Sequence, residues 1–417
     1  MKGIEMQEYS HKKKSTRIRS KTRKKTPNLL LLFLILFSSS VFYNEEHLKL
    51  YIGIASFICL YAYFRAIIRP TIIAHSISNS FTGWLLILFS IYFYYGLVLT
   101  KYSFFNSDYF LFTLIIILVI QLLFIDVNHN TMIEVFTKSS AIGSLAVCGF
   151  ILINEWDLII SGGTRIGDSG SGNVNTVAMY LGLMSIPSIY KFLFENKRFY
   201  LVVYIVSIAF MLMTGSKKAL IYIILGLVIL SVQKNGIRLQ RYIFPILLAV
   251  GVIILILNNQ FLYNIIGART MDFLASIGFK IEGAHYSNST SLRLSMYKLA
   301  FQAFMENPIF GGGWFYFSAY SGLGTYSHNN YTELLVNYGI VGFLIYYIMF
   351  FYVLLKLKKI SKLDNNAKLL STMIIVILVC DAAAVTFSLY LINYIVLVFG
   401  FLYVRNYRIA NKSIDTP

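Results

Sequence analysis

Residues 334–357 read LLVNYGIVGFLIYYIMFFYVLLKL, and this run decides the fold class. It is longer than the roughly 20 residues that an α-helix needs to cross the hydrocarbon core of a bilayer. Its apolar residues are continuous and do not alternate with polar ones, which excludes a strand of a transmembrane barrel. The run therefore predicts a membrane-spanning helix, and the chain contains eleven more runs of this kind.

The apolar runs predict an all-α, polytopic membrane protein with about 12 transmembrane helices. Hydrophobic residues make up 57% of the 417 residues and charged residues only 13%, whereas a soluble domain is about a quarter charged. Several runs are short, so flanking Tyr, Trp and Ser or a locally thinned bilayer must supply the difference. The runs cover residues 29–43, 50–64, 84–100, 109–125, 141–156, 174–194, 199–213, 219–232, 242–257, 334–357, 369–387 and 389–404.

The distribution of charge predicts the orientation. Ten Lys and Arg residues lie in the first 27 residues. No sequence motif of a nucleic-acid-binding domain follows them, so we expect no nucleic-acid partner. We interpret this tail as a disordered segment that holds the N-terminus at the cytoplasmic membrane surface. With the N-terminus inside, only nine of the 36 Lys and Arg residues fall in outer segments, as the positive-inside rule requires. Both termini are then cytoplasmic, and the long polar loops at 157–173 and 258–333 are outside.

This orientation divides the chain into five parts. We expect a basic tail (1–28), a first group of transmembrane helices (29–257), a large extracytoplasmic loop (258–333), a second group (334–404) and a cytoplasmic tail (405–417). Within the large loop, Leu292, Met296, Leu299 and Ala303 recur at helical spacing, which predicts a short helix along the membrane surface. Asn307-Pro308 should end that helix.

The few outer cations lie beside unusual sequences. Arg165 stands in the glycine-rich stretch SGGTRIGDSG, Lys217 and Lys218 follow Thr214-Gly215-Ser216, and Arg293 is on the predicted surface helix. The helix dipole disfavours cations at a helix start, so a bound anion would explain the two lysines. Contact with lipid headgroups is the alternative for each of these cations.

His328 stands just before the helix predicted at 334–357, in Ser327-His328-Asn329-Asn330-Tyr331-Thr332-Glu333. The positive end of a helix dipole lowers the pKa of an imidazole and favours its neutral form, which can accept a proton from a hydroxyl. Asp381 is an acid inside an apolar run, which is a functional candidate or a plain interhelical hydrogen-bonding group.

Two longer stretches carry a resemblance to a known family. The stretches FQAFMENPIFGGG (301–313) and SHNNYTELLVNYGIVG (327–342) resemble the signature region of the O-antigen ligase and polymerase superfamily. Two earlier landmarks of that family are similar to NVNTVA (173–178) and TGSK (214–217). The family consists of polytopic, GT-C-like glycosyltransferases that pass a glycan from a polyprenyl pyrophosphate to an acceptor hydroxyl on the outer face of the membrane.

The resemblance implies roles for individual residues. Arg165 and Arg293 would bind the pyrophosphate, and His328 would activate the acceptor. Lys217 stands where the family often has an arginine, and a lysine lacks the bidentate fork of a guanidinium. Lys217 and Lys218 are therefore candidates for substrate binding, together with Asn175, Asn329, Tyr331, Glu333 and Asp381. We expect no metal, no cofactor and a single displacement with inversion.

These expectations combine into a function. We expect polymerisation of polyprenyl-pyrophosphate-linked oligosaccharide units into a capsular, exopolysaccharide or O-antigen glycan, in the cytoplasmic membrane of a bacterium. Membrane lipids, a chain-length regulator and a flippase are the expected partners. An O-antigen ligase that uses a lipid A core or another acceptor is the first alternative. A polysaccharide flippase is an alternative of another class, and it predicts polar residues along the middle of several spans.

Overall fold

A computed structural model describes residues 56–57, 59–64, 67–95, 108–161, 166–167, 174–236, 258, 289–388 and 390–412. These residues form helices, turns and loops, with no β-strand among them. The all-α prediction is confirmed for this part of the chain. The helices are α4 (Pro70–Ile77), α5 (Ser80–Tyr94), α6 (Asp108–Phe124), α7 (His129–Asn154), α8 (Trp156–Ile160), α10 (Val174–Glu195), α11 (Arg198–Met213), α12 (Lys217–Asn235), α16 (Ser289–Glu306), α17 (Tyr316–Ser321), α18 (Asn330–Ile360), α19 (Asn365–Cys380) and α20 (Leu391–Lys412).

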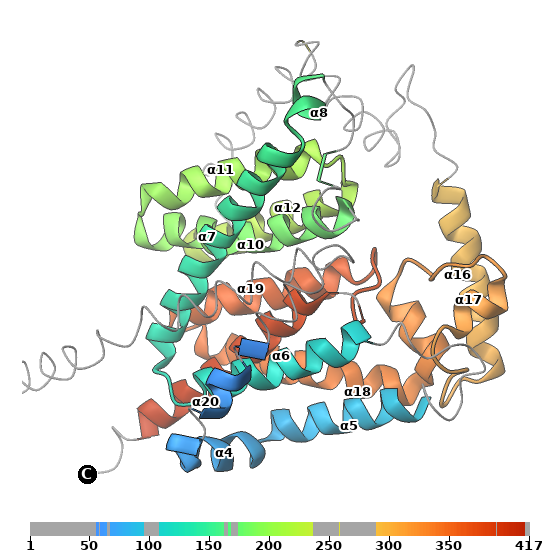
Figure 1. Ribbon diagram of the computed structural model, residues 1–417, viewed down its shortest axis with the longest axis horizontal. Coiled ribbons are helices and arrows are strands. Elements are labelled where there is room, and N and C mark those ends of the chain that lie inside the picture. Colours follow the sequence, from blue (N-terminus) through green and yellow to red (C-terminus); the bar gives the residue numbers. More distant parts are fainter. Residues whose placement is uncertain are drawn as a thin grey trace, which may run out of the picture.

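The long helices form a bundle with two groups. Helices α5, α6, α18, α19 and α20 lie roughly along one direction, and α10, α11 and α12 form a second group beside α19 (Figure 1). Helix α7 runs steeply past both groups and contacts α10, α11 and α20. Helix α20 is the centre of the first group, since it contacts α6, α7, α18 and α19 and buries nearly all of its side chains from 391 to 404.

The described helices are consistent with the predicted polytopic membrane protein. Three of them, α7, α10 and α18, are long and apolar enough to cross a membrane, and α5, α11, α19 and part of α6 are shorter apolar helices. Nine of the twelve predicted runs overlap described helices, although the run predicted at 369–387 is helical only as far as Cys380. The runs at 29–43 and 242–257 lie outside the described residues, as does part of 50–64, so the number of twelve spans stays a prediction.

Helix α7 begins at His129, well before the apolar run predicted at 141–156. Its first half is polar in sequence, yet Thr137, Ser139 and Ser140 are buried. The hydroxyls of Thr137 and Ser140 donate hydrogen bonds to carbonyl oxygens of their own helix. Small side chains satisfied in this way let neighbouring helices approach closely, which hydropathy alone does not indicate.

Helix α18 continues through a kink at Gly339, whose φ of 63° and ψ of −169° are not helical. Two amides at the kink bond outside the helix, because Ile340 N donates to the oxygen of Pro308 at 2.9 Å and Val341 N donates to that of Ile309 at 3.2 Å. Gly312 and Gly313 in turn donate to carbonyls at 336 and 337. The glycine run therefore returns the chain to α18, and the sequence did not predict the kink.

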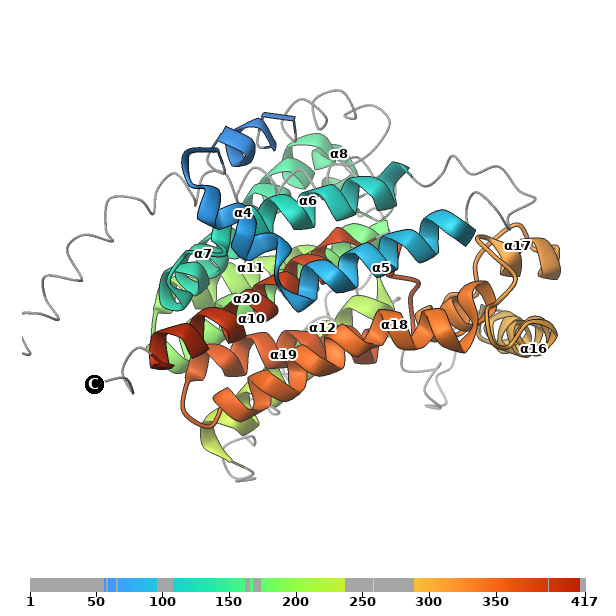
Figure 2. The same cartoon turned by 90° about the horizontal axis from the view of Figure 1, so that it is seen from below.

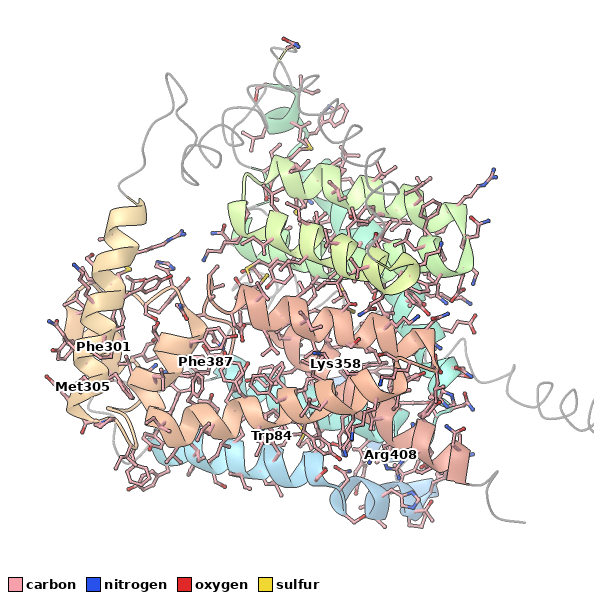
Figure 3. All side chains as sticks on the ribbon, turned by 180° about the vertical axis from the view of Figure 1, so that it is seen from behind. Trp84, Phe301, Met305, Lys358, Phe387 and Arg408 are labelled. Carbon is pink, nitrogen blue, oxygen red and sulfur yellow. The ribbon has the colours of Figure 1, made fainter. Side chains whose placement is uncertain are left out.

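Helices α16 and α17 stand together at one end of the bundle, beside the start of α18 (Figures 1 and 2). Helix α16 buries Met296, Ala300 and Ala303, and it exposes Phe301 and Met305 (Figure 3). It ends at Glu306, directly before Asn307-Pro308, so the predicted helix and its end are confirmed. Its position along a membrane surface stays a prediction.

Candidate active site

The His328 turn, residues Ser327 to Asn329, leads into α18 at the end of the bundle where α16 and α17 stand. His328 has a φ of 59°, a left-handed conformation that is uncommon for a residue with a Cβ. Residues held in this region cost of order 1–3 kcal/mol and persist only where their surroundings fix them. The contacts on both sides of His328 show what fixes it.

The residues on either side of His328 are bound to the first turn of α18. Asn329 is the N-cap, and its side-chain oxygen accepts from the amides of Tyr331 at 2.9 Å and Thr332 at 3.3 Å. The buried Glu333 carboxylate accepts from the Ser327 amide at 2.7 Å. The side chains of Asn329 and Glu333, which we predicted to bind substrate, therefore hold the His328 turn in place.

The imidazole of His328 is half-buried. It packs edge-on against Tyr326, with ring centroids 4.7 Å apart, and its Nδ1 is buried without a hydrogen-bond partner among the described residues. Burial, followed by the positive charges of Lys218 and Arg293, lowers the pKa of His328 to about 4. The predicted lowering of this pKa is confirmed, but its causes are burial and the two cations, whereas the sequence-based prediction invoked the helix dipole.

The fold brings Lys218 and Arg293 to His328 from different helices. Arg293 is exposed on the first part of α16, whereas Lys218 lies at the start of α12, directly before the apolar run at 219–232. Burial, followed by the positive charge of Arg293, lowers the pKa of Lys218 to about 8. Two cations and one neutral imidazole thus share one electrostatic environment. Lys217 begins α12, and its side chain lies outside the description.

Arg165 lies outside the described residues, but the two residues that follow it are described. The Ile166 amide donates to the oxygen of Met213 at 3.4 Å, and the Gly167 amide donates to the buried Glu155 carboxylate at 2.6 Å. Gly167 also faces Thr214, at the turn that leads into Lys217 and Lys218. The chain directly after Arg165 is thus anchored beside the α11–α12 turn.

The remaining predicted residues lie on three helices. Asn175 is the second residue of α10. Tyr331 is in the first turn of α18, and its hydroxyl donates to the oxygen of Leu378. Asp381 follows α19, is fully buried, and accepts hydrogen bonds from the side chains of Asn330, Tyr347 and Thr386. Their roles in substrate binding stay predictions.

Sequence reasoning did not assign a role to Asn330 or Glu155. Asn330 belongs to the motif quoted above, but nothing in its position within the sequence distinguishes it from Asn329. Its partners at 347, 381, 386 and 387 are distant in the chain, so only the fold shows what it does. In the part of the chain that the structure describes, no group of three His, Cys, Asp or Glu side chains could hold a metal ion.

The arrangement is suited to one kind of chemistry. Cations placed beside a neutral imidazole can hold an anionic leaving group while the imidazole removes a proton from an incoming hydroxyl. Residues 202–347 match the family model described as O-antigen ligase. The match covers less than half of the chain and makes this part of it similar to the O-antigen ligase family. No curated protein matches the chain.

The region that carries the superfamily match begins within α11 and ends within α18. It contains Lys218, Arg293 and His328, which are the three residues that share one electrostatic environment. Arg165, Asn175 and Asp381 lie outside it. The match supports an O-antigen ligase or polymerase type of function in polysaccharide biosynthesis, and it supports a location in a membrane.

Proposed function

We propose that the protein polymerises polyprenyl-pyrophosphate-linked oligosaccharide units at the outer face of the bacterial cytoplasmic membrane. The observation that carries this proposal is that the positive charges of Lys218 and Arg293 act on the half-buried imidazole of His328. A pyrophosphate leaving group needs positive charge, and a sugar hydroxyl acceptor needs a base. The match of residues 202–347 to an O-antigen ligase supports a lipid-linked glycan donor and a hydroxyl acceptor.

The reaction is a single displacement. The hydroxyl oxygen of the acceptor attacks the anomeric carbon of the donor, whose bond to the pyrophosphate oxygen breaks with inversion. His328 takes the hydroxyl proton through Nε2, because Nδ1 is buried. Arg293 and Lys218, with Arg165 as a third predicted cation, neutralise the departing polyprenyl pyrophosphate. No metal ion takes part in this scheme.

Donor binding also changes the strength of the base. A pKa of about 4 makes His328 a weak base in the free protein, whereas general bases work best when their pKa is near the operating pH. A pyrophosphate between the imidazole and the two cations offsets their charge and adds negative charge of its own. The pKa of His328 therefore rises when the donor binds, and the base becomes effective only with the donor in place.

A ligase uses the same cations and the same base, so it is the nearest alternative function. A composition rich in Ile, Lys, Asn and Tyr favours the polymerase, since it suggests an AT-rich Gram-positive genome that has no lipid A core. A flippase needs polar groups along the middle of several spans. The buried acids Glu333 and Asp381 lie at the start of α18 and after the end of α19, so neither places a carboxylate in the middle of a described helix.

Purified protein in proteoliposomes with polyprenyl-pyrophosphate-linked units tests the proposal. We expect a ladder of glycans that grows by whole units, with release of polyprenyl pyrophosphate. A ligase transfers one glycan to each added acceptor and gives no ladder. A flippase moves the donor between leaflets and leaves its glycan attached. Donor that stays both intact and in its leaflet contradicts all three functions.

A further inference from the structure

We infer that Asn330 is a positioning residue for His328, and that it acts through a buried polar cluster with Tyr347, Asp381 and Thr386. We name these four residues the Asn330 latch. The latch joins the first residue of α18 to the turn that follows α19. The inference deepens the proposed function and rests on it wherever it concerns catalysis.

The side-chain amide of Asn330 has two donor hydrogens and two acceptor lone pairs, and all four are used. Its Nδ2 donates to the Tyr347 hydroxyl at 2.9 Å and to Asp381 Oδ2 at 3.2 Å. Its Oδ1 accepts from the amides of Thr386 at 2.8 Å and Phe387 at 2.9 Å. The side chain is fully buried, so water cannot replace a lost partner.

Asp381 completes the latch from the other side. Its Oδ1 accepts from the Thr386 hydroxyl at 2.6 Å, and its Oδ2 accepts from the Tyr347 hydroxyl at 2.9 Å as well as from Asn330. Its backbone oxygen accepts from the Asn330 amide at 2.8 Å. A carboxylate engaged in this way and fully buried is placed to hold protein groups, which favours a structural role over the predicted contact with substrate.

Asn330 is close enough in sequence to His328 for the latch to determine the position of the His328 backbone. Asn330 is two residues after His328 and follows the N-cap Asn329. The Tyr331 hydroxyl adds a further bond to the end of α19, at the oxygen of Leu378. Phe387, whose amide bonds to Asn330, lies toward the α16 end of the bundle (Figure 3). The backbone of the His328 turn is thereby fixed to α19, and a displacement of about 1 Å at a reacting group can cost about 10²-fold in rate.

The amide of Asn330 and the carboxylate of Asp381 can be exchanged by a double substitution, because the two side chains have nearly the same shape. In Asn330→Asp alone, a second carboxylate oxygen faces Asp381 Oδ2. In Asp381→Asn alone, either two amide groups face each other, or the new amide turns and points its donor hydrogens at the Thr386 hydroxyl. In the double variant, the amide at 381 donates to the carboxylate at 330, and the Tyr347 hydroxyl reverses its two bonds. Each group then has a partner again, and the cluster keeps one carboxylate.

The experiment compares the wild type, Asn330→Asp, Asp381→Asn and the double variant, with Asn406→Asp as the matched control. Asn406 is a buried amide whose Nδ2 donates to the carbonyls of Phe124 at 3.4 Å and Val127 at 2.8 Å, far from His328 in the bundle. We expect Asn330→Asp and Asp381→Asn each to lower kcat about 10²-fold, with little change in the KM for the donor. The double variant should recover kcat to within about tenfold of the wild type, and the control should lose only thermal stability.

The outcomes separate the latch from the function. The inference is overturned if both single variants keep the wild-type kcat. It is also overturned if the double variant recovers its melting temperature but not its kcat, and this second result would indicate that Asp381 contacts the substrate. If the wild type shows no transfer, the proposed function fails. The melting temperatures then decide on the latch alone, since interacting residues give non-additive losses. Additive losses in the double variant overturn it.

Discussion

The ring of Tyr326 packs edge-on against the imidazole of His328, with the centroids 4.7 Å apart and the planes at 68°. Because Nδ1 is buried, Nε2 is the imidazole nitrogen that can accept a proton from an acceptor hydroxyl. The left-handed conformation of His328 and the action of two cations on its pKa support the proposal that this side chain has a chemical role. The first prediction concerns this side chain.

Replacing His328 by alanine should lower transfer by roughly 10²–10⁴-fold, which is the usual contribution of a general base. His328→Gln keeps a polar side chain of similar size that cannot take up a proton, so it should fail as well. Lipid-linked donor should accumulate in cells, because its assembly is untouched. Chromatography of the lipid-linked pool and the glycan ladder measure both effects. A glutamine variant with most of the wild-type activity would show that His328 only positions the acceptor.

The pH profile should show two different acid limbs. The free enzyme holds the pKa of His328 at about 4, so kcat/KM should stay level from pH 7 to about 5 and fall as the imidazole protonates near pH 4. The donor raises this pKa, so kcat should fall at a higher pH than kcat/KM. Steady-state kinetics in buffers of constant ionic strength measure both limbs. Identical profiles for the wild type and for residual His328→Ala activity would remove His328 from the mechanism.

Arg293→Ala should abolish polymer formation with near-normal protein levels, because the side chain is exposed and its loss leaves no cavity. Arg293→Lys should also be poor, because the bidentate contacts with phosphate oxygens are lost. Lys298→Ala is the matched control, since it removes an exposed cation from the same helix and should leave transfer intact. Full activity in Arg293→Lys would indicate a contact with lipid headgroups only. Arg165→Ala should behave like Arg293→Ala.

Gly339→Ala should prevent normal assembly of the outer end of α18. An added Cβ would stand 2.2 Å from the carbonyl oxygen of Ile309, and the φ of 63° disfavours any side chain. Gly322→Ala is the control, because its φ is 67° and a Cβ there meets nothing within 4 Å. We expect the control to lose about 1–2 kcal/mol and Gly339→Ala to lose about 1–3 kcal/mol more. Thermal melting in detergent compares the two, and equal melting temperatures would contradict the packing at the kink.

The predicted orientation can be tested with single cysteines in a background where Cys59, Cys148 and Cys380 are replaced by serine. Cysteines at Gly170 and Gly324 should react with a membrane-impermeant thiol reagent added to intact cells. A cysteine at Asn365, exposed at the start of α19, should react only after the cells are opened. Labelling of Asn365→Cys in intact cells would overturn the orientation and the outer position of His328. Gly170 lies outside the described residues, so this prediction for it rests on sequence alone.

The sequence by itself was enough to predict the helical membrane architecture and the helix before Pro308. Both depend on local properties, because an apolar run of about 20 residues must satisfy its own backbone hydrogen bonds in lipid. Helix α16 was predictable for a similar reason, since Leu292, Met296, Leu299 and Ala303 recur at helical spacing. The proline at 308 marks its end. The quoted motifs indicated the resemblance that the match over residues 202–347 supports, and they made His328 the predicted base.

The tertiary structure alone decided how distant segments meet. The kink at Gly339 arises because Pro308 and Ile309 supply carbonyl acceptors to amides of α18. The polar start of α7 is buried because α10, α11 and α20 pack against that helix. In the same way, Lys218 and Arg293 act on the pKa of His328 because three helices converge. Such contacts depend on the shapes of whole packed surfaces, and the spacing of residues along one helix does not encode them.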